Sequence, residues 1–180
     1  MHAVSPGAAL ARPSLGDIFE EHFDYVWSSL RRLDVPPSDL EDQVQEVFLR
    51  VHAKLGDYDP QRPLRPWIFG FAFRVASDYR RLARHRFEII GAEIEVVEPS
   101  AAADDRMAAS EERAFVEAAL LSVSLERRAV LLMHDVDDVP VPTIAATLGI
   151  PVNTAYSRLR VAREEFAAAW KRLLKKRGER

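Results

Sequence analysis

The 180-residue chain contains no cysteine. This absence excludes disulfides, thiolate catalysis, iron–sulfur clusters and cysteine-based zinc sites. Glycine is also scarce, with 7 residues against 11 prolines, a balance more typical of helices separated by stiff turns than of a glycine-rich sheet protein. No apolar run approaches the roughly 18 residues of a membrane span, and the N-terminal stretch lacks the basic flank and apolar core of a secretion signal. We therefore expect a cytoplasmic protein with no membrane segment.

The small net charge of −3 conceals four charged blocks. Residues 17–59 hold 11 acidic and 4 basic side chains, a net charge of −7, and residues 88–117 hold 9 and 2, again −7. Residues 62–87 hold 7 arginines against one aspartate, a net charge of +6, and residues 145–180 hold 9 basic and 3 acidic side chains, also +6. Such blocks favour two surfaces that face a polyanion and two acidic surfaces, with solvated helix faces as the alternative.

Apolar residues recur at three- to four-residue spacing and strand signals are weak, so we predict an all-α fold. The first helix covers residues 18–33 and stops before Pro36. The second covers residues 40–55 and is expected to begin at a capping box formed by Ser38 and Glu41. Its apolar stripe leaves a mostly acidic face exposed.

A loop with three prolines, residues 56–66, precedes a third helix that starts at Trp67 and carries arginines in its later turns. Further helices are predicted after Phe115, after Ser124 as a cap, and on both sides of Gly149. We therefore predict two small helical domains in this order: a flexible N-terminus (1–14), a first domain (15–87), a linker (88–112) and a second domain (113–176).

The last two predicted helices are joined by a short turn that contains Gly149, an arrangement typical of a helix-turn-helix whose second helix enters the major groove of DNA. Gly149 allows a sharp turn, and Pro151 suits a first helical turn because an amide there has no acceptor. An ordinary helical hairpin with a basic face is the alternative. The residues that we predict to contact DNA are Asn153, Thr154, Tyr156, Ser157, Arg158, Arg160 and Arg163.

Within this set, Arg160 is expected to read a base edge, most plausibly of guanine, and Arg163 to contact a phosphate. A second basic cluster mixes arginine with aromatic residues, a composition typical of surfaces that bind single-stranded nucleic acid. Trp67, Phe71 and Tyr79 are spaced for a core, so the arginines are the residues expected to meet the strand. They are Arg62, Arg65, Arg74, Arg80, Arg81 and Arg84.

Three stretches, DLEDQVQEVFLRVH, RPWIFGFAFRVASDYRR and TIAATLGIPVNTAYSRLRVARE, resemble the successive signatures of the extracytoplasmic-function sigma factors, the smallest members of the bacterial primary sigma family. The resemblance covers about residues 15–87 and 113–170. It implies a region-two domain that binds core RNA polymerase and melts the minus-ten promoter element, and a region-four domain that reads the minus-thirty-five element. It also implies that the acidic helix docks on the clamp helices of the largest polymerase subunit through Asp39, Asp42, Gln45 and Glu46.

Some positions depart from the family pattern. Thr143 stands where glutamate is frequent, and Pro66 stands where threonine is frequent. Tyr156 and Val161 replace basic residues at positions where the family reads bases, so the resemblance does not fix the promoter sequence. A chain without cysteine has no thiol switch of its own, and an anti-sigma factor is therefore the expected regulator.

Dimensions also favour two modules. A compact 180-residue globule has a radius of gyration of about 16 Å. Two promoter elements about 20 base pairs apart are separated by roughly 70 Å at about 3.4 Å per pair. A 25-residue linker over 88–112 extends to roughly 80 Å. Two linked domains span that distance, whereas a single globule does not.

Two other functions fit parts of the sequence. A stand-alone helix-turn-helix regulator would use the first domain for sensing or dimerisation, but it needs neither the arginine-rich loop nor the acidic helix. A metal-dependent hydrolase would draw its ligands from MHDVDD, that is from His134, Asp135, Asp137 and Asp138. These are nearly contiguous and lack the spacing of a convergent metal site. No glycine-rich phosphate loop is present, so we expect no enzyme, cofactor or metal.

Overall fold

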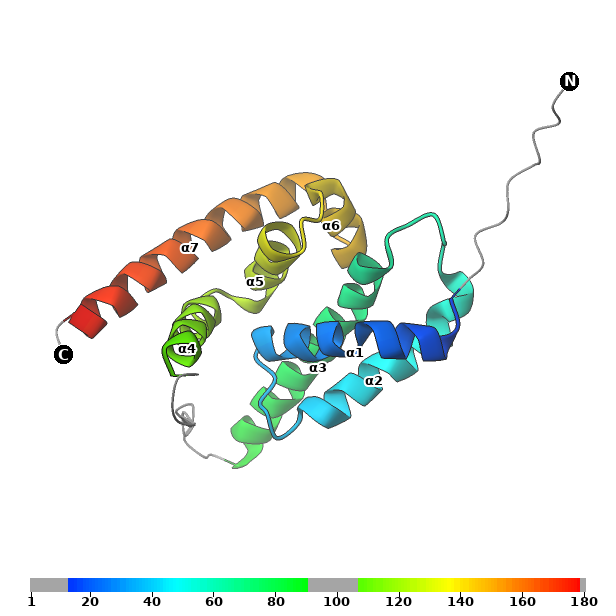
Figure 1. Cartoon of the computed structure of the whole chain (residues 1–180), viewed down its shortest axis with the longest axis horizontal. Coiled ribbons are helices and arrows are strands. Elements are labelled where there is room, and N and C mark those ends of the chain that lie inside the picture. Colours follow the sequence, from blue (N-terminus) through cyan, green and yellow to red (C-terminus); the bar gives the residue numbers. More distant parts are fainter. Residues whose placement is uncertain (1–12, 91–106, 179–180) are drawn as a thin grey trace, which may run out of the picture.

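The computed structural model describes residues 13–90 and 107–178, which form two helical modules (Figure 1). The N-terminal module (residues 13–90) contains α1 (Leu15–Arg32), α2 (Leu40–Lys54), the short 3₁₀-helix η1 (Leu55–Asp57) and α3 (Leu64–Ile90). The C-terminal module (residues 107–178) contains α4 (Met107–Leu121), α5 (Leu125–Leu131), the π-helix η2 (Leu132–Val136), α6 (Val141–Leu148) and α7 (Val152–Gly178). No strand occurs in either described range. The predicted all-α fold of two helical domains is confirmed.

Helices α1, α2 and α3 pack around one apolar core in the N-terminal module. Val26 and Leu30 of α1, Val44 of α2 and Ile68 of α3 are fully buried there. These positions follow the three- to four-residue spacing of the sequence, because one face of each helix must leave water. The acidic side of α2 is left outside this core.

The predicted capping box at the start of α2 is wrong. Helix α2 begins at Leu40, so Asp39 and not Ser38 is its N-cap residue, and the Ser38 hydroxyl donates to the carboxylate of Asp39 at 2.8 Å. Asp39, the residue before α2, makes no side-chain capping bond. A capping box is found instead at α1, where Ser14 and Asp17 each accept a hydrogen bond from the other's backbone amide.

The third helix is longer at both ends than predicted. It begins at Leu64, so Pro66 lies inside its first turn, where a missing amide leaves no hydrogen bond unmade. It continues to Ile90, and α4 begins at Met107, so both helices enter the stretch that was predicted as a linker. The rest of that stretch, residues 91–106, lies outside the described residues, as does nearly all of the predicted flexible N-terminus.

The C-terminal module builds the predicted helix-turn-helix from α6 and α7. Gly149 ends α6 in the left-handed conformation with φ of 67°, which a residue without a Cβ adopts at little cost. Ala155, Leu159 and Ala162 are buried on one side of α7. The predicted helix after Ser124 does begin there, but the Ser124 side chain makes no capping bond, and the helix changes to the π form at Leu132.

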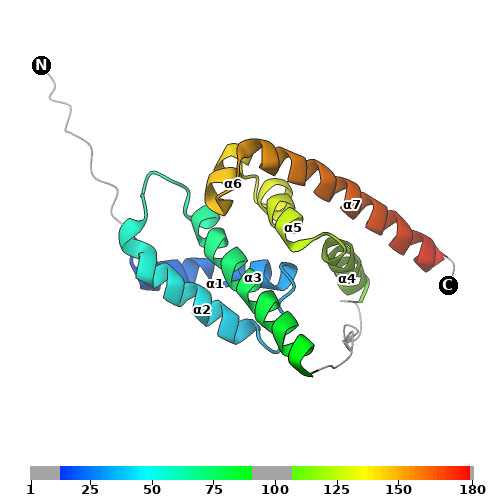
Figure 2. The same ribbon diagram turned by 180° about the vertical axis from the view of Figure 1, so that it is seen from behind.

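The two modules lie against each other, and their buried apolar residues form one continuous cluster. Helix α6 packs on the first half of α3, and α4 lies next to α1 (Figure 1). Seen from behind, α7 runs along the side of the C-terminal module away from α1–α3 (Figure 2). Within the described ranges, no helix is both long and apolar enough to cross a lipid bilayer.

Candidate nucleic-acid and polymerase-binding surfaces

The first turns of α7 present an exposed polar surface, here called the reading face and made of Asn153, Tyr156, Ser157 and Arg160. The buried Ala155 and Leu159 alternate with these residues and fix which side of the helix turns outward. Tyr156 is 55% exposed although it is a large aromatic residue. Thr154 and Arg158 are half-buried at the edges of this face. The start of α7 is therefore free to meet a ligand.

Two arginines of α7 have acidic partners. Arg160 Nη1 donates to Glu164 Oε1 at 2.7 Å, one turn along the same helix. Arg163 Nε donates to Asp135 Oδ2 of η2 at 2.9 Å, and the Arg163 guanidinium holds the pKa of Asp135 below its usual value. An open depression of about 590 Å³ lies between these two arginines, His134 and Tyr156. The Arg160 pair is more exposed, so Arg160 is the easier of the two to redirect to DNA.

The six arginines of the predicted melting surface, here called the arginine surface, differ in exposure. Arg81 and Arg84 are exposed near the later turns of α3. Arg80 is half-buried, with Nη1 3.5 Å from Asp34 Oδ2. Arg65 lies over the ring of Tyr25. Arg62 and Arg74, the remaining two, are both exposed and border a groove against α6.

The aromatic residues of α3 belong to the core and not to a stacking platform. Phe69 and Phe71 are buried, and Trp67 packs against Tyr58 and Phe71 with ring centroids 4.9 Å apart in both pairs. Phe73 is partly buried against the same cluster. The side chain of Phe87 is not among those that the structure describes. Among the side chains of α3 that the structure describes, arginines and Leu82, but no aromatic ring, are therefore exposed.

Helix α2 carries the predicted acidic face, of which Asp42, Gln45 and Glu46 remain accessible. The fourth predicted residue, Asp39, is half-buried and accepts a hydrogen bond of 2.6 Å from the Tyr79 hydroxyl of α3. Sequence reasoning missed Leu49, which is 64% exposed one turn after Gln45. The signal available in the sequence was the position of this leucine, three residues after Glu46 and four after Gln45. We define the acidic face as Asp42, Gln45, Glu46 and Leu49.

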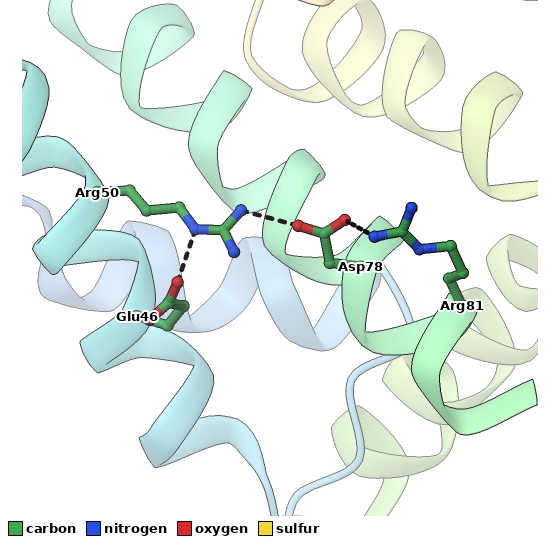
Figure 3. Close-up of polar contacts among 4 residues, drawn as sticks. All are labelled: Glu46, Arg50, Asp78 and Arg81. Carbon is green, nitrogen blue, oxygen red and sulfur yellow. Dashed lines mark hydrogen bonds and ion pairs between the residues drawn. The ribbon is translucent and has the colours of Figure 1, made fainter. Parts of the chain in front are cut away.

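An ion-pair chain connects the acidic face with the arginine surface (Figure 3). Arg50 donates to Glu46 at 2.7 Å and to Asp78 at 3.0 Å, and Asp78 also accepts from Arg81 at 3.1 Å. These contacts raise the pKa of Arg50, with the Glu46 hydrogen bond as the largest cause. Because the four residues are partly exposed, each pair contributes little to stability. This series of ion pairs orients the side chains of α2 and α3 toward each other.

The acidic residues of MHDVDD do not converge on one point. Asp135 binds Arg163 of α7, whereas Asp137 accepts a hydrogen bond of 2.7 Å from the Tyr25 hydroxyl in the other module. Asp138 has a positive φ of 54° at the turn before α6. Across the described residues, no group of three or more His, Cys, Asp or Glu side chains is placed to hold a metal ion. The motif therefore makes structural contacts: Asp135 joins η2 to α7, and Asp137 joins the C-terminal module to α1.

Comparison with known proteins identifies both modules. Residues 18–86 match the family model for Sigma-70 region 2, and residues 116–166 match the one for Sigma-70 region 4. The ECF RNA polymerase sigma factor SigL of Mycobacterium tuberculosis is 32% identical over 164 residues, which cover 90% of this chain and 92% of SigL. The RNA polymerase sigma factor CnrH of Cupriavidus metallidurans is 28% identical, with 86% of this chain and 85% of CnrH covered.

Solved structures agree with these matches. CnrH in complex with the cytosolic domain of CnrY has a TM-score of 0.61 and 26% identity, and covers 86% of this chain and 85% of its own. The sigma factor RpoE in complex with the anti-sigma factor NepR from Bartonella quintana, with a TM-score of 0.64 and 20% identity, covers 86% and 97% and supports the fold alone. The resemblance drawn from three motifs is confirmed. The chain belongs to the ECF RNA polymerase sigma factors.

Proposed function

We propose that this protein acts as an alternative sigma subunit, which directs core RNA polymerase to a specific set of promoters. The N-terminal module (region two) binds core polymerase and melts the minus-ten element, and the C-terminal module (region four) reads the minus-thirty-five element. The work of this chain is binding and strand separation, and the polymerase performs the chemistry. Its place of action is accordingly the cytoplasm.

The observation that carries this proposal is the presence of three accessible surfaces of different chemistry on one small chain. The reading face projects from the second helix of a helix-turn-helix, as duplex readout requires. The arginine surface follows a separate helix, α3. The acidic face lies on α2, with an exposed leucine among its polar residues. A regulator that only binds duplex DNA has no use for the second and third surfaces.

Each surface has its own task in the proposal. Asp42, Gln45, Glu46 and Leu49 dock on the clamp helices of the largest polymerase subunit, where a small apolar centre with a charged rim suits a protein interface. Asp39 supports this face from behind through its bond to Tyr79. The arginine surface follows the non-template strand after an unstacked base enters the loop before α3. Arg160 reads a base, with Asn153, Thr154, Tyr156, Ser157 and Arg158 around it, and Arg163 contacts phosphate.

The regulator in this proposal is an anti-sigma factor. RpoE has been solved with the anti-sigma factor NepR, and CnrH with the cytosolic domain of CnrY. This chain has no cysteine with which to sense redox changes by itself. Control by a bound protein is therefore the simplest arrangement.

Run-off transcription tests the function. Core polymerase is combined with a genomic promoter pool, with and without this protein, and the transcripts are sequenced. We expect the protein to bind promoter duplex weakly alone and to add a small set of specific start sites to core polymerase. Tight specific binding of duplex by the isolated protein, with no added start sites, would instead identify a stand-alone regulator.

A further inference from the structure

We infer that two exposed apolar residues at the start of α7, Val152 and Tyr156, contact the 5-methyl group of a pyrimidine in the major groove of the minus-thirty-five element. The protein therefore prefers a methylated pyrimidine, thymine or 5-methylcytosine, over uracil or cytosine at one position of that element. The inference rests on the proposed reading of this element by α7, and it adds a base preference that the family assignment leaves open.

Val152 and Tyr156 are large apolar side chains that the fold does not bury. Val152, the first residue of α7, is 41% exposed, and Tyr156, one turn later, is 55% exposed. Neither belongs to the apolar cluster of the described residues, which includes Ala155, Leu159 and Ala162 of the same helix. Packing within the chain therefore does not explain why these two positions are apolar.

Val152, Tyr156 and Arg160 form one row along α7. They are four residues apart, and side chains at that spacing are neighbours on one side of a helix, with about 5–6 Å between their Cβ atoms. The buried Ala155 and Leu159 turn this row outward. Successive base pairs are about 3.4 Å apart. The base beside Tyr156 should therefore lie within about two base pairs of the base that Arg160 reads.

The space beside this row is partly apolar. Tyr156 and Arg160 border the open depression of about 590 Å³, and so do Val141 and Leu159, which are each 5% exposed. Among the described residues that line the depression, Glu164 is the one carboxylate, and it accepts a hydrogen bond from Arg160. A methyl group beside Tyr156 therefore has carbon atoms to contact, with Arg160 close by for a polar base edge.

The major groove contains one apolar group, the C5 methyl of thymine, since the other three bases present hydrogen-bond donors and acceptors there. The Val152 side chain has no polar atom, so a methyl group is the feature of a base edge that it contacts favourably. The Tyr156 hydroxyl donates or accepts a hydrogen bond, so it suits O4 of thymine and N4 of cytosine alike. Discrimination therefore depends on the methyl group, and 5-methylcytosine should be read like thymine.

This mode of reading makes promoter recognition sensitive to DNA methylation. Burial of one methyl group against the two side chains should strengthen binding by about three- to fivefold. A cytosine at the contacted position is therefore a weaker site until its C5 carbon carries a methyl group, although the base sequence is the same in both states.

A protein surface is the other class of partner that covers exposed apolar side chains. Val152 and Tyr156, however, lie among the polar residues Asn153, Ser157 and Arg160. They also belong to the first turns of the second helix of a helix-turn-helix, which is the part that meets base edges. A DNA base is therefore the occupant that their surroundings favour, and the experiment separates the two.

Single-base substitutions in a promoter duplex test the inference. The starting duplex is the most active member of a randomised minus-thirty-five library transcribed by the wild-type holoenzyme, and the Arg160→Ala variant locates the base that Arg160 reads. Each thymine of the element, on either strand, is then replaced in turn by deoxyuridine, which lacks only the methyl group. Binding of the holoenzyme is measured by competition with the unmodified duplex.

We expect deoxyuridine to weaken binding by about three- to fivefold at one thymine within two base pairs of the base read by Arg160, and to have little effect elsewhere. At the same position, 5-methylcytosine should bind about three- to fivefold more tightly than cytosine. Equal binding of the thymine and deoxyuridine duplexes at every position would overturn the inference, as would a preferred element with no thymine in this window.

Protein variants assign the effect to the two residues. Val152→Ser with Tyr156→Ala removes the apolar contact and should bind thymine and deoxyuridine duplexes equally. Tyr156→Phe keeps the ring and should keep the wild-type ratio. The control is Leu174→Ala, which removes a 46% exposed apolar side chain near the other end of α7 and should also keep the ratio.

Two results with these variants would contradict the inference. A full thymine preference in the double variant would show that another residue reads the methyl group. Weaker binding of the double variant to all duplexes, with the ratio unchanged, would place Val152 and Tyr156 at a protein contact. The deoxyuridine comparison with the wild-type protein decides the question if the double variant does not fold.

The two proposals fail in different ways. If the wild-type protein adds no start sites to core polymerase, the proposed function is wrong, and the methyl reading that rests on it is wrong as well. If the wild-type protein directs specific starts but its binding depends on no thymine methyl group, the methyl reading alone is wrong and the proposed function stands.

Discussion

Helices α3 and α7 are both 27 residues long and both carry an arginine cluster, yet they present it differently. Arg62 of the loop before α3 and Arg74 of α3 are exposed but border a groove against α6 of the other module. The first turns of α7 project from the outer side of the molecule (Figure 1). An equal net charge of +6 in two blocks of the sequence therefore corresponds to one surface that borders the other module and one that faces outward.

This difference concerns how easily DNA reaches each arginine. An arginine at the start of α7 has no element of the other module beside it, whereas DNA that reaches Arg62 or Arg74 must approach next to α6. The acidic face of α2 is open like the start of α7.

The largest effect should come from the open acidic face. Asp42→Lys with Glu46→Gln removes its charge without placing a second cation next to Arg50, and we expect co-purification with core polymerase to fall by about tenfold or more. The control is Glu20→Lys with Asp24→Asn, the same change at the same i, i+4 spacing on the exposed side of α1. Equal loss in both variants would point to net charge and not to this face.

The next largest effect concerns base reading by the open helix. Arg160→Ala should cost about 1–3 kcal/mol at one promoter position and relax the preference there. The measurement is transcription of a randomised minus-thirty-five library by each variant holoenzyme. Glu164→Gln is the companion variant, since it frees Arg160 from its partner without removing it. A uniform loss over all sequences would assign Arg160 to phosphate instead.

On α3, the effect of a single arginine should be smaller and should depend on the template. Arg81 is 78% exposed and pairs only with Asp78 among the described residues, so Arg81→Ala should leave the fold intact. We expect open-complex formation on duplex promoters to fall by about three- to fivefold for one lost phosphate contact. A pre-melted bubble template should recover much of this loss. Unchanged activity on duplex would exclude Arg81 from melting.

The smallest expected effect concerns Arg163, and it tests whether this later arginine of α7 is also available to DNA. Asp135→Asn weakens the restraint on Arg163, and we expect binding to promoter DNA to increase by about two- to threefold, similarly for all sequences. Arg163→Ala should reduce binding and lower the salt slope by about 1. If Asp135→Asn weakens DNA binding, Asp135 positions Arg163 for phosphate and does not compete with it.

Much of this architecture was predictable from local sequence patterns. Helix positions followed from apolar spacing, and the helix-turn-helix followed from Gly149, whose left-handed conformation favours a residue without a side chain. The predicted capping box failed because α2 begins one residue later than the spacing rule assumed, which makes Asp39 and not Ser38 the N-cap residue. The start of α3 was missed because Pro66 was taken for a loop residue, although proline is allowed in a first turn.

The contacts between modules were not predictable in this way. Tyr25 and Asp137 are 112 positions apart, and neither carries a local signal for the other. Arg128 reads as an ordinary helix-surface arginine until its burial is seen. Gly70 offered the one usable hint, because glycine inside a helix costs stability and often marks a close approach of backbones. Long-range packing, and not helix formation, decides which arginines lie beside the other module.

Arg128 reaches the N-terminal module through the backbone carbonyl of Arg32 and not through a side chain. Every amino acid supplies that carbonyl, so substitutions at residue 32 during evolution preserve the contact. Residue 128 has no such freedom, because no shorter or less branched donor reaches the carbonyl oxygens of Leu121, Val123 and Arg32 together. A deep mutational scan should therefore show tolerance at one end of this contact and intolerance at the other, and related sequences should show no covariation between the two positions.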